Sequence, residues 1–484
     1  MSDRSSMLPD VDENMTDAVG GMMIFDDKAL MRRHAVGYPS LVAPAPAVYD
    51  VLHAAATDHG GMGTQGRGLS PAAPIGGEPR GVPGLNEGVF YPPETSSRGL
   101  RPAPSPMMRR RSTTGMARCL VLLVDFDDNP GTRPAADIQD MLFSQGTYAT
   151  RSLRDYYQEN SYGQLDVDGL VLGWLRMPQL YAYYTDGQRG LGAYPRNTQK
   201  LVEDALAVAT QQVDLRQFDA DGDLFVDGLF VVHAGSGAET VIDPARQPAA
   251  IWSHQWNTSL PVVSNGITAY AYCTTPEDGR IGVFCHEFGH MLGLPDLYDT
   301  TYRSTGVGQW CVMGTGSWND GGRTPGHLCA WAKARLGWIA PAVVTGAQVL
   351  QLQPIEQDKG GVYRLWTGGA VGSDYLLIEA RQATGFDHAL PGAGLLIWRI
   401  DEVQRDNTRP GAYLVGLEQA DGRHDLELGR NSGDAGDPYP GSTQALRYDA
   451  ATAPNFDPQR HRPYDVTVTD IADTGGAIMC QVTV

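Results

Sequence analysis

The stretch His286–Asp299, HEFGHMLGLPDLYD, constrains what this chain can fold into more than any other part of it. On a helix, residues four apart lie on the same face, so His286 and His290 can direct two imidazole nitrogens at one metal ion. Glu287 then lies beside that ion, where a carboxylate can act on a metal-bound water. The alternative interpretation is a pair of core histidines on a buried helix.

The residues after the second histidine extend the pattern. Gly293 follows His290 by three positions, where a residue with positive φ ends a helix, and Pro295 prevents the helix from continuing. Asp296 then offers a carboxylate. The pattern H-E-x-x-H-x-x-G-x-x-D predicts a zinc site with His286, His290 and Asp296 as ligands.

A methionine in a glycine-rich loop follows, in the stretch GQWCVMGTGSW at residues 308–318. Zinc peptidases with the extended signature carry a methionine turn beneath the metal, and Met313 is well placed to form it. Its role there is packing, as a polarizable floor under the ligands. Plain filler in a loop is the alternative.

Six stretches carry a resemblance to a known family. They are HEFGHMLGLPDLYD (286–299), SLRDYYQENSYGQL (152–165), DADGDLFVDGLFVVHAGSGAE (219–239), IWSHQW (251–256), WAKARLGW (331–338) and GLLIWRIDE (394–402). Together they resemble the immune inhibitor A family of metallopeptidases, over roughly residues 117–440. The resemblance implies a secreted, calcium-supported zinc endopeptidase with an added β domain, and nothing about its particular substrate.

The motif predicts a reaction. Zinc with three protein ligands leaves a position open for water and lowers the pKa of that water toward about 7. Glu287, one residue after His286, points away from the metal and serves as a general base, which later passes the proton to the leaving amine. A donor for the oxyanion is missing, because Thr315 occupies the position two residues after Met313 where related enzymes often place a tyrosine. The third ligand also stays open, since an acidic residue further along could replace Asp296.

Two other functions are alternatives to a zinc endopeptidase. One is a non-catalytic, calcium-binding surface or adhesion protein built on a peptidase scaffold; the complete zinc motif disfavours it. The other is a zinc hydrolase of small amides, which fits less well with a substrate-binding edge strand and an added β domain. The stretch IWSHQW is our candidate for that edge strand, which would bind extended peptides by main-chain hydrogen bonds.

A second cation site is predicted between residues 219 and 227. Aspartates stand at positions 1, 3, 5 and 9 of a calcium-loop pattern, with Gly222 for the sharp turn: Asp219, Asp221, Asp223 and Asp227. The loop is not an EF-hand, because position 12 is Phe230 in an apolar strand pattern. A solvated acidic turn is the alternative to structural calcium.

Composition excludes some partners. The net charge is −19, which would repel phosphate backbones, so nucleic acid is an unexpected partner. No apolar run reaches the length needed to span a bilayer. The six cysteines include no Cys-x-x-Cys pair, and Cys285 belongs to the apolar helix face. We expect a monomer acting on protein or peptide substrates.

The first part of the chain differs from the rest in amino-acid composition. Residues 1–116 are rich in Pro, Gly, Ala and Arg beyond about residue 44, carry no clear signal peptide, and contain one short predicted helix at Asp26–His34. This segment is either a propeptide, with Arg109–Arg111 as a cleavage point, or a flexible leader. No cysteine precedes Cys119, so a thiolate cannot hold the zinc; the acidic run Asp10–Glu13 offers carboxylates instead.

The remaining chain predicts an α+β protein. Residues 117–340 are expected to form a zincin/metzincin-like catalytic domain, with a mixed sheet and the active-site helix. Beyond Ala340 the apolar pattern alternates with period two, which predicts an antiparallel, β-sandwich-like domain over residues 341–484. Secretion is expected from the resemblance and the acidic composition.

Overall fold

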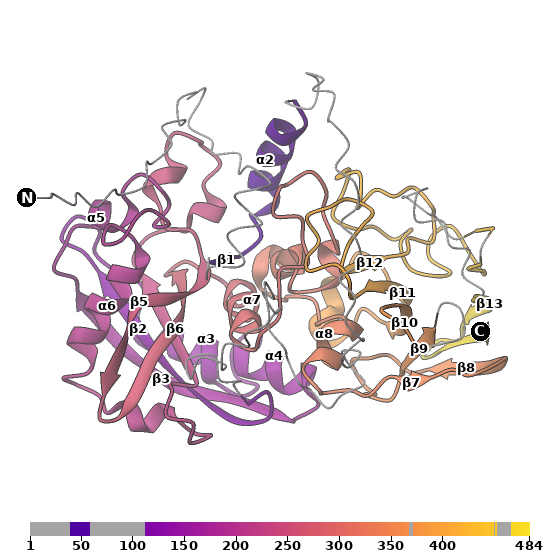
Figure 1. Cartoon of the computed structure of the whole chain (residues 1–484), viewed down its shortest axis with the longest axis horizontal. Coiled ribbons are helices and arrows are strands. Elements are labelled where there is room, and N and C mark those ends of the chain that lie inside the picture. The colour runs from indigo at the N-terminus through magenta and orange to yellow at the C-terminus, as the bar shows by residue number, and fades with distance from the viewer. Residues whose placement is uncertain (1–38, 59–111, 367–370, 450, 453–465) are drawn as a thin grey trace, which may run out of the picture.

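The computed structural model describes residues 39–58, 112–366, 371–449, 451–452 and 466–484, and its first half is built on a six-stranded mixed sheet. The sheet order is β1-β5-β6-β4-β2-β3 (Figure 1). Its strands are β1 (Ser40–Leu41), β2 (Gly115–Asp125), β3 (Leu165–Arg176), β4 (Gly228–His233), β5 (His254–Ser264) and β6 (Ile267–Pro276). The pairs β2–β3, β2–β4 and β4–β6 are parallel, whereas β5 is antiparallel to both β6 and β1.

Strand β2 explains why this sheet is covered on both faces. Its continuous apolar run places Cys119, Val121 and Leu123 on one face and Leu120, Leu122 and Val124 on the other, and all six are buried. The first face packs on α3 (Ala135–Phe143), α4 (Leu153–Asn160) and α7 (Ile281–Met291). The second packs on α5 (Tyr181–Thr185) and α6 (Thr198–Ala209). A buried sheet between two helical layers therefore supports the helix that carries the histidines.

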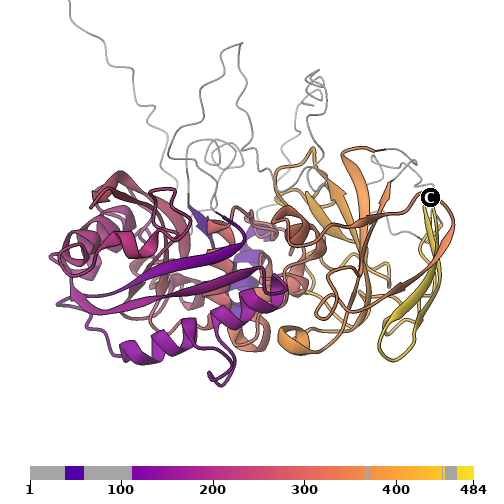
Figure 2. The ribbon, with the colours of Figure 1, turned by 90° about the horizontal axis from the view of Figure 1, so that it is seen from below.

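The other half of the molecule holds two smaller sheets, on the right of Figure 1 and in orange to yellow in Figure 2. One has the order β12-β11-β10-β9-β7, with β7 (Ala342–Val343), β9 (Val362–Trp366), β10 (Asp374–Arg381), β11 (Gly394–Asp401) and β12 (Val415–Leu417). The other joins β13 (Thr467–Asp473), β14 (Ile478–Thr483) and β8 (Gln348–Leu352). The described pairs are antiparallel except β7–β9, which is parallel, so the expectation of an antiparallel region is wrong for that pair.

The five-stranded sheet joins the two halves. Leu377, Leu396 and Trp398 extend the same core that contains α4 and α7. Leu376, Ile378 and Ile397 face a separate core that they share with β8, β13 and β14. Helix α8 (Ala330–Arg335) contacts β10 and β11 of this sheet. Short 3₁₀ helices complete the connections: η3 (Leu215–Phe218), η4 (Ala238–Thr240), η5 (Gln247–Ala249), η6 (Gly308–Trp310), η7 (Thr315–Gly322) and η8 (Gly385–Ala389).

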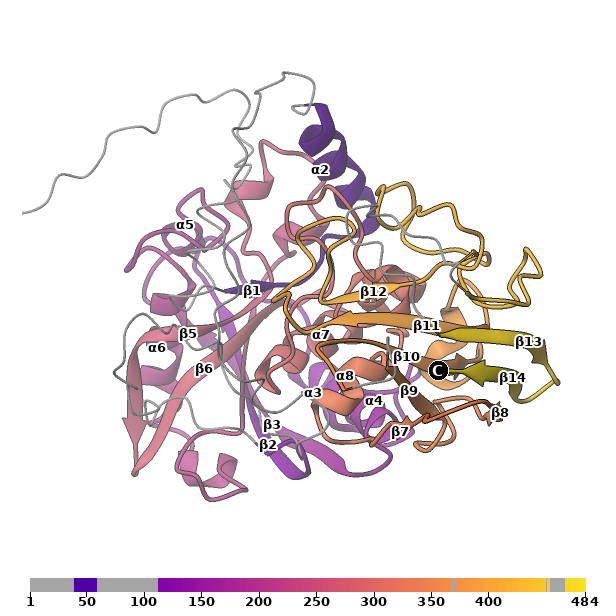
Figure 3. The same ribbon diagram turned by 45° about the vertical axis from the view of Figure 1, so that its right-hand side comes forward.

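Residues 39–58, which precede the main sheet by a long stretch of sequence, lie against it. Strand β1 extends the sheet beyond β5, and α2 (Pro46–Asp58) follows above α7, as the indigo elements in Figures 1 and 3 show. Val42, Val48 and Leu52 form a small core with Trp252 and other residues of the first half. This part of the N-terminal segment is therefore packed on the domain that follows it.

Three expectations fall outside the described residues: the helix at Asp26–His34, the acidic run Asp10–Glu13 and the basic junction Arg109–Arg111. Across the described part of the chain, no helix combines the length and apolar character needed to cross a membrane. All six cysteines are buried free thiols, and Cys285 lies in the core as expected.

Candidate metal centre

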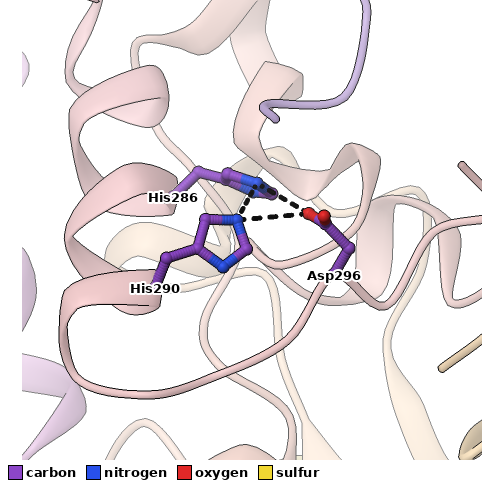
Figure 4. A group of neighbouring side chains, drawn as sticks. All are labelled: His286, His290 and Asp296. Atoms are coloured by element: carbon purple, nitrogen blue, oxygen red, sulfur yellow. Dashed lines mark hydrogen bonds and ion pairs between the residues drawn. The ribbon is translucent and has the colours of Figure 1, made fainter. Parts of the chain in front are cut away.

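Three side chains converge at the C-terminal end of α7. His286 and His290 lie one helical turn apart with their Nε2 atoms 3.0 Å from each other, and Oδ1 of Asp296 lies 3.2 Å from each Nε2 (Figure 4). All three residues are buried. The structure therefore brings together the three residues that the motif singled out as ligands.

The hydrogen bonds of the Nδ1 atoms determine whether the Nε2 atoms of the two histidines can bind a metal. Nδ1 of His286 lies 2.8 Å from the carbonyl oxygen of Val312, and Nδ1 of His290 lies 2.8 Å from that of Leu294. A carbonyl only accepts, so each Nδ1 carries the proton and each Nε2 directs a lone pair inward. Two such lone pairs 3.0 Å apart, beside a carboxylate, repel one another unless a cation lies between them. The donor set and its orientation thus fit a zinc ion.

A tight turn delivers Asp296 to the histidines. Gly293 has φ +96°, a conformation that favours glycine, and the amide of Leu294 donates to the carbonyl of Gly289 at 3.1 Å, closing the helix end. The next carboxylate, Asp299, is engaged elsewhere: it accepts from the hydroxyls of Thr301 and Ser304. Among the acidic residues that the structure describes, Asp296 is the one whose carboxylate lies with both histidine nitrogens.

Burial and the neighbouring histidines act in opposite directions on the pKa of Asp296. Burial alone raises the pKa of its carboxyl, but the adjacent His290 and His286 outweigh burial and lower that pKa to about 2. Asp296 is therefore a carboxylate in this site.

Met313 lies directly under the helix turn that carries the histidines. It is fully buried, and a Cβ added at Gly289 would come within 2.5 Å of its sulfur. The glycine between the two histidines is therefore required by the close approach of the methionine. The same loop holds His286 and the residue after Asp296 in place, because the carbonyl of Val312 accepts from His286 and that of Met313 accepts from the Leu297 amide at 2.8 Å.

Glu287 is fully buried beside these ligands. Among the described residues, neither of its carboxylate oxygens has a hydrogen-bond partner. Burial raises the pKa of Glu287 well above its usual range, the negative charges of Asp296 and Glu239 raise it further, and the backbone amide of Val42 acts in the opposite direction. An unpaired buried carboxyl is costly, and its usual explanation is a functional partner.

The N-terminal segment enters this site through its backbone. The carbonyl oxygen of Leu41 lies 3.2 Å from Nε2 of His286, and it accepts a hydrogen bond from the hydroxyl of Tyr298 at 3.0 Å. The sequence motifs indicated neither contact. Tyr298 stands within the DLYD stretch, but its spacing from the histidines matches no pattern that marks a catalytic hydroxyl. Thr315, two residues after Met313, is buried and its hydroxyl has no hydrogen-bond partner in the described structure.

Backbone contacts hold the same segment along its length. Leu41 and Ser40 pair antiparallel with His254 and Gln255 on β5. The indole of Trp252 donates to the carbonyl of Val42 at 3.0 Å, and that of Trp318 donates to the carbonyl of Ala43. On α2, the Tyr49 hydroxyl donates to the carbonyl of Ser304 at 2.6 Å. Part of the stretch IWSHQW thus does bind an extended segment, and that segment belongs to this chain.

The predicted calcium ligands are brought together in part. Carboxylate oxygens of Asp219, Asp221 and Asp227 lie within 4.8 Å of one another, around the turn at Gly222 with φ +73°. Asp223 is not in this group, and its Oδ1 accepts from the Phe225 amide at 2.8 Å. Among the described residues, Oδ1 of Asp219 is buried without a hydrogen-bond partner.

Comparison with known proteins agrees with this geometry. Residues 110–339 match the family described as immune inhibitor A peptidase M6, catalytic domain. Immune inhibitor A of Bacillus thuringiensis subsp. alesti is 33% identical over 252 residues, which are 42% of this chain and 36% of that protein. Pre-pro-metalloprotease PrtV of Vibrio cholerae serotype O1 (strain M66-2) is 32% identical over 268 residues, 45% of this chain and 29% of that protein. The matched part thus spans about a third of the length of these curated relatives. The resemblance seen in the motifs is confirmed: residues 110–339 are similar to the catalytic domain of the immune inhibitor A family of metallopeptidases.

Proposed function

We propose that this chain is a zinc-dependent endopeptidase whose metal is held by His286, His290 and Asp296. The observation that carries the proposal is the convergence of two inward-facing Nε2 atoms and one carboxylate beside an unpaired, buried Glu287. When bound there, zinc supplies a Lewis acid that acidifies a water molecule and polarises a carbonyl. The similarity to metallopeptidases supports the same activity.

Glu287 is the general base in this proposal. Its carboxylate takes a proton from the attacking water and later delivers that proton to the leaving amine. The burial that raises the pKa of Glu287 makes it a stronger base than an exposed glutamate. His286 and His290 keep their protons on Nδ1 throughout, because the carbonyls of Val312 and Leu294 hold them there.

Residues 39–58 restrain the enzyme in this proposal. Leu41 places a main-chain carbonyl beside the ligand nitrogens, and β1 pairs with the strand that a peptide substrate would use. A relative described as a pre-pro-metalloprotease is consistent with an inhibitory N-terminal segment. The segment would then inhibit the enzyme through the backbone oxygen of Leu41 and by covering the site, without a thiolate ligand.

Calcium, export and substrate complete the proposal. Asp219, Asp221 and Asp227 would bind a structural calcium ion through their carboxylate oxygens, the kind of ligand that calcium prefers. We infer a secreted enzyme that acts on proteins or peptides as a monomer, with the β-rich region after residue 340 as an added domain. Of these proposals, the calcium site has the most direct structural support, because Oδ1 of Asp219 is buried without a hydrogen-bond partner among the described residues.

The test uses the full chain in a form that releases the segment. Val48 on α2 is 2% exposed, so Val48→Asp would bury an unpaired carboxylate, which costs several kcal/mol and favours release of the helix. Since about 1.4 kcal/mol is a tenfold change in population, we expect casein cleavage to rise about tenfold or more. Ala54→Asp, at an exposed position of the same helix, is the matched control and should leave the rate unchanged.

Adding Glu287→Ala to Val48→Asp separates chemistry from folding. Cleavage should fall by about 10²- to 10⁴-fold, the contribution of a positioned base, while zinc content measured by metal analysis stays the same. Unchanged cleavage in this zinc-replete double variant would refute the role of Glu287. A Val48→Asp chain that holds zinc but cleaves nothing would support a non-catalytic scaffold instead.

A further inference from the structure

The carbonyl of Leu41 identifies where a substrate carbonyl would lie. It is a main-chain oxygen in an extended strand, and it contacts one of the three predicted ligands, His286, at 3.2 Å. Its other polar contact is the Tyr298 hydroxyl at 3.0 Å. A hydroxyl donor thus reaches a carbonyl oxygen that lies beside a predicted metal ligand, which is where a carbonyl undergoing attack would need a donor.

The adjoining groups of the segment match a substrate as well. β1 runs antiparallel to β5, with Leu41 opposite His254, so the segment extends the sheet as a bound peptide would. The amide of Val42 donates to the carbonyl of Ser253, the residue before β5, at 3.1 Å. The peptide bond between Leu41 and Val42 therefore has its oxygen toward Tyr298 and His286, and its N–H toward the carbonyl of Ser253.

Tyr298 is held rigidly enough to act as a preorganised donor. It lies two residues after Asp296, is fully buried, and its ring centre is 6.4 Å from that of His286. The preceding residue, Leu297, is fixed on both sides: its amide donates to Met313 at 2.8 Å, and its carbonyl accepts from Val307 at 3.0 Å. A donor that needs no reorganisation stabilises developing charge most effectively.

We propose that Tyr298 is a catalytic residue, whose hydroxyl donates a hydrogen bond to the oxygen of the scissile carbonyl as negative charge develops there. This inference rests on the proposed peptidase function. Water oxygen forms a bond to the carbonyl carbon, the π electrons move to the carbonyl oxygen, and Glu287 takes the water proton. The electrons then return, the carbon–nitrogen bond breaks, and the amine leaves with the proton from Glu287. Tyr298 keeps its own proton throughout.

A purely structural role for Tyr298 makes a different prediction. If its hydroxyl only anchors the N-terminal segment through Leu41, then Tyr298→Phe should loosen the segment and raise cleavage by the otherwise unaltered chain. If Tyr298 is catalytic, the same substitution lowers cleavage once the segment has been released by Val48→Asp. With the segment already released by Val48→Asp, an anchoring role predicts no change in cleavage on Tyr298→Phe, whereas a catalytic role predicts a fall.

The experiment compares Tyr298→Phe with its parent, both carrying Val48→Asp in the full-length chain. We expect kcat to fall by about 10²- to 10³-fold with little change in KM, the loss typical of one oxyanion donor. Zinc content and melting temperature should match those of the parent. Tyr156→Phe is the matched control, because Tyr156 is equally buried and donates to the carbonyl of Gly326, away from the site.

A binding measurement makes the test independent of turnover. The probe is a phosphinic peptide with the sequence of residues 39–44, in which a tetrahedral phosphinate replaces the peptide bond between Leu41 and Val42. Its affinity should fall at least about tenfold in Tyr298→Phe, whereas the unmodified peptide should bind the variant and its parent alike, because only the tetrahedral group carries oxyanion charge. Tyr156→Phe should bind both peptides as the parent does.

Each outcome separates this inference from the proposed function. Equal kcat in the parent and Tyr298→Phe, or equal phosphinate affinity, would overturn the role of Tyr298 and leave the peptidase assignment intact. A parent that holds zinc but neither cleaves casein nor binds the phosphinate would overturn both.

Discussion

At the scale of single residues, the site depends on how closely Met313 approaches the helix that carries the histidines. Gly289 has no side chain to occupy the space that the sulfur fills, since an added Cβ would lie 2.5 Å from it. The pattern H-E-x-x-H leaves this position unspecified, yet the tertiary packing demands glycine there. One methyl group at this point would displace either the methionine or the helix turn between His286 and His290.

Gly289→Ala should therefore destabilise the protein by about 1–3 kcal/mol, the usual cost of overpacking a core, and weaken zinc binding. Thermal melts and zinc titrations measure the two effects. Met313→Ala removes the atom that the new methyl group meets, so the double variant should be more stable than the sum of the two single changes predicts. Strict additivity would show that the methyl group is accommodated elsewhere.

At the scale of elements, the loop between η3 and β4 is an acidic turn whose carboxylates face one another. Asp219, Asp221 and Asp227 crowd together, although backbone amides such as those of Leu224 and Ala220 satisfy some of their oxygens. Bringing like charges together is unfavourable unless a cation offsets it. The turn leads directly into β4, at the centre of the main sheet, so ordering it should stabilise the whole domain.

Millimolar calcium should raise the melting temperature, because a ligand that binds only the folded state adds stability in proportion to RT ln(1 + [L]/Kd). Asp221→Asn should remove most of this increment, and Asp223→Asn, outside the convergent group, should retain most of it. Differential scanning calorimetry with and without chelator makes the comparison. Identical melts of the unaltered protein under both conditions would contradict the calcium site.

At the scale of the whole molecule, buried charges join the two halves. Arg381 on β10 makes a two-point ion pair with Asp387 at 2.7 and 2.8 Å, and it donates to the carbonyl of Trp310 at 3.1 Å. Asp387 also accepts from the His327 amide at 2.8 Å. Trp310 and His327 belong to the part matched by the peptidase family, so these bonds tie the β-rich region to it.

Arg381→Met should cost about 3–5 kcal/mol of unfolding free energy, because it leaves the buried carboxylates of Asp387 and Glu379 without their cation. Arg399→Met is the control: its ion pair with Asp374 is longer, at 3.8 Å, and less buried, so its loss should cost less than about 1 kcal/mol. Chemical denaturation followed by tryptophan fluorescence measures both. A small effect at Arg381 would mean that the two halves are held together by apolar packing alone.

The parts of the site that are close together in the chain could be predicted from the amino-acid sequence. His286 and His290 share a face because the helix repeat places residues four apart together, and Gly293 and Asp296 follow within one turn. The convergence of Asp219, Asp221 and Asp227 could be predicted for the same reason, whereas Asp223 lies outside that group. Zinc and calcium binding remain predictions, but the convergence of these side chains follows from short-range geometry.

Contacts between residues far apart in the chain could not be predicted in this way and became known from the folded structure. Leu41 reaches His286 from 245 residues away through main-chain atoms, whose position no side-chain pattern reports. The proposed role of Tyr298 rests on its hydrogen bond to the Leu41 carbonyl. The need for glycine at position 289 follows from its contact with Met313. Spacing along a helix is fixed by backbone geometry, whereas strand pairing and close packing depend on which distant surfaces fit together once the core has formed.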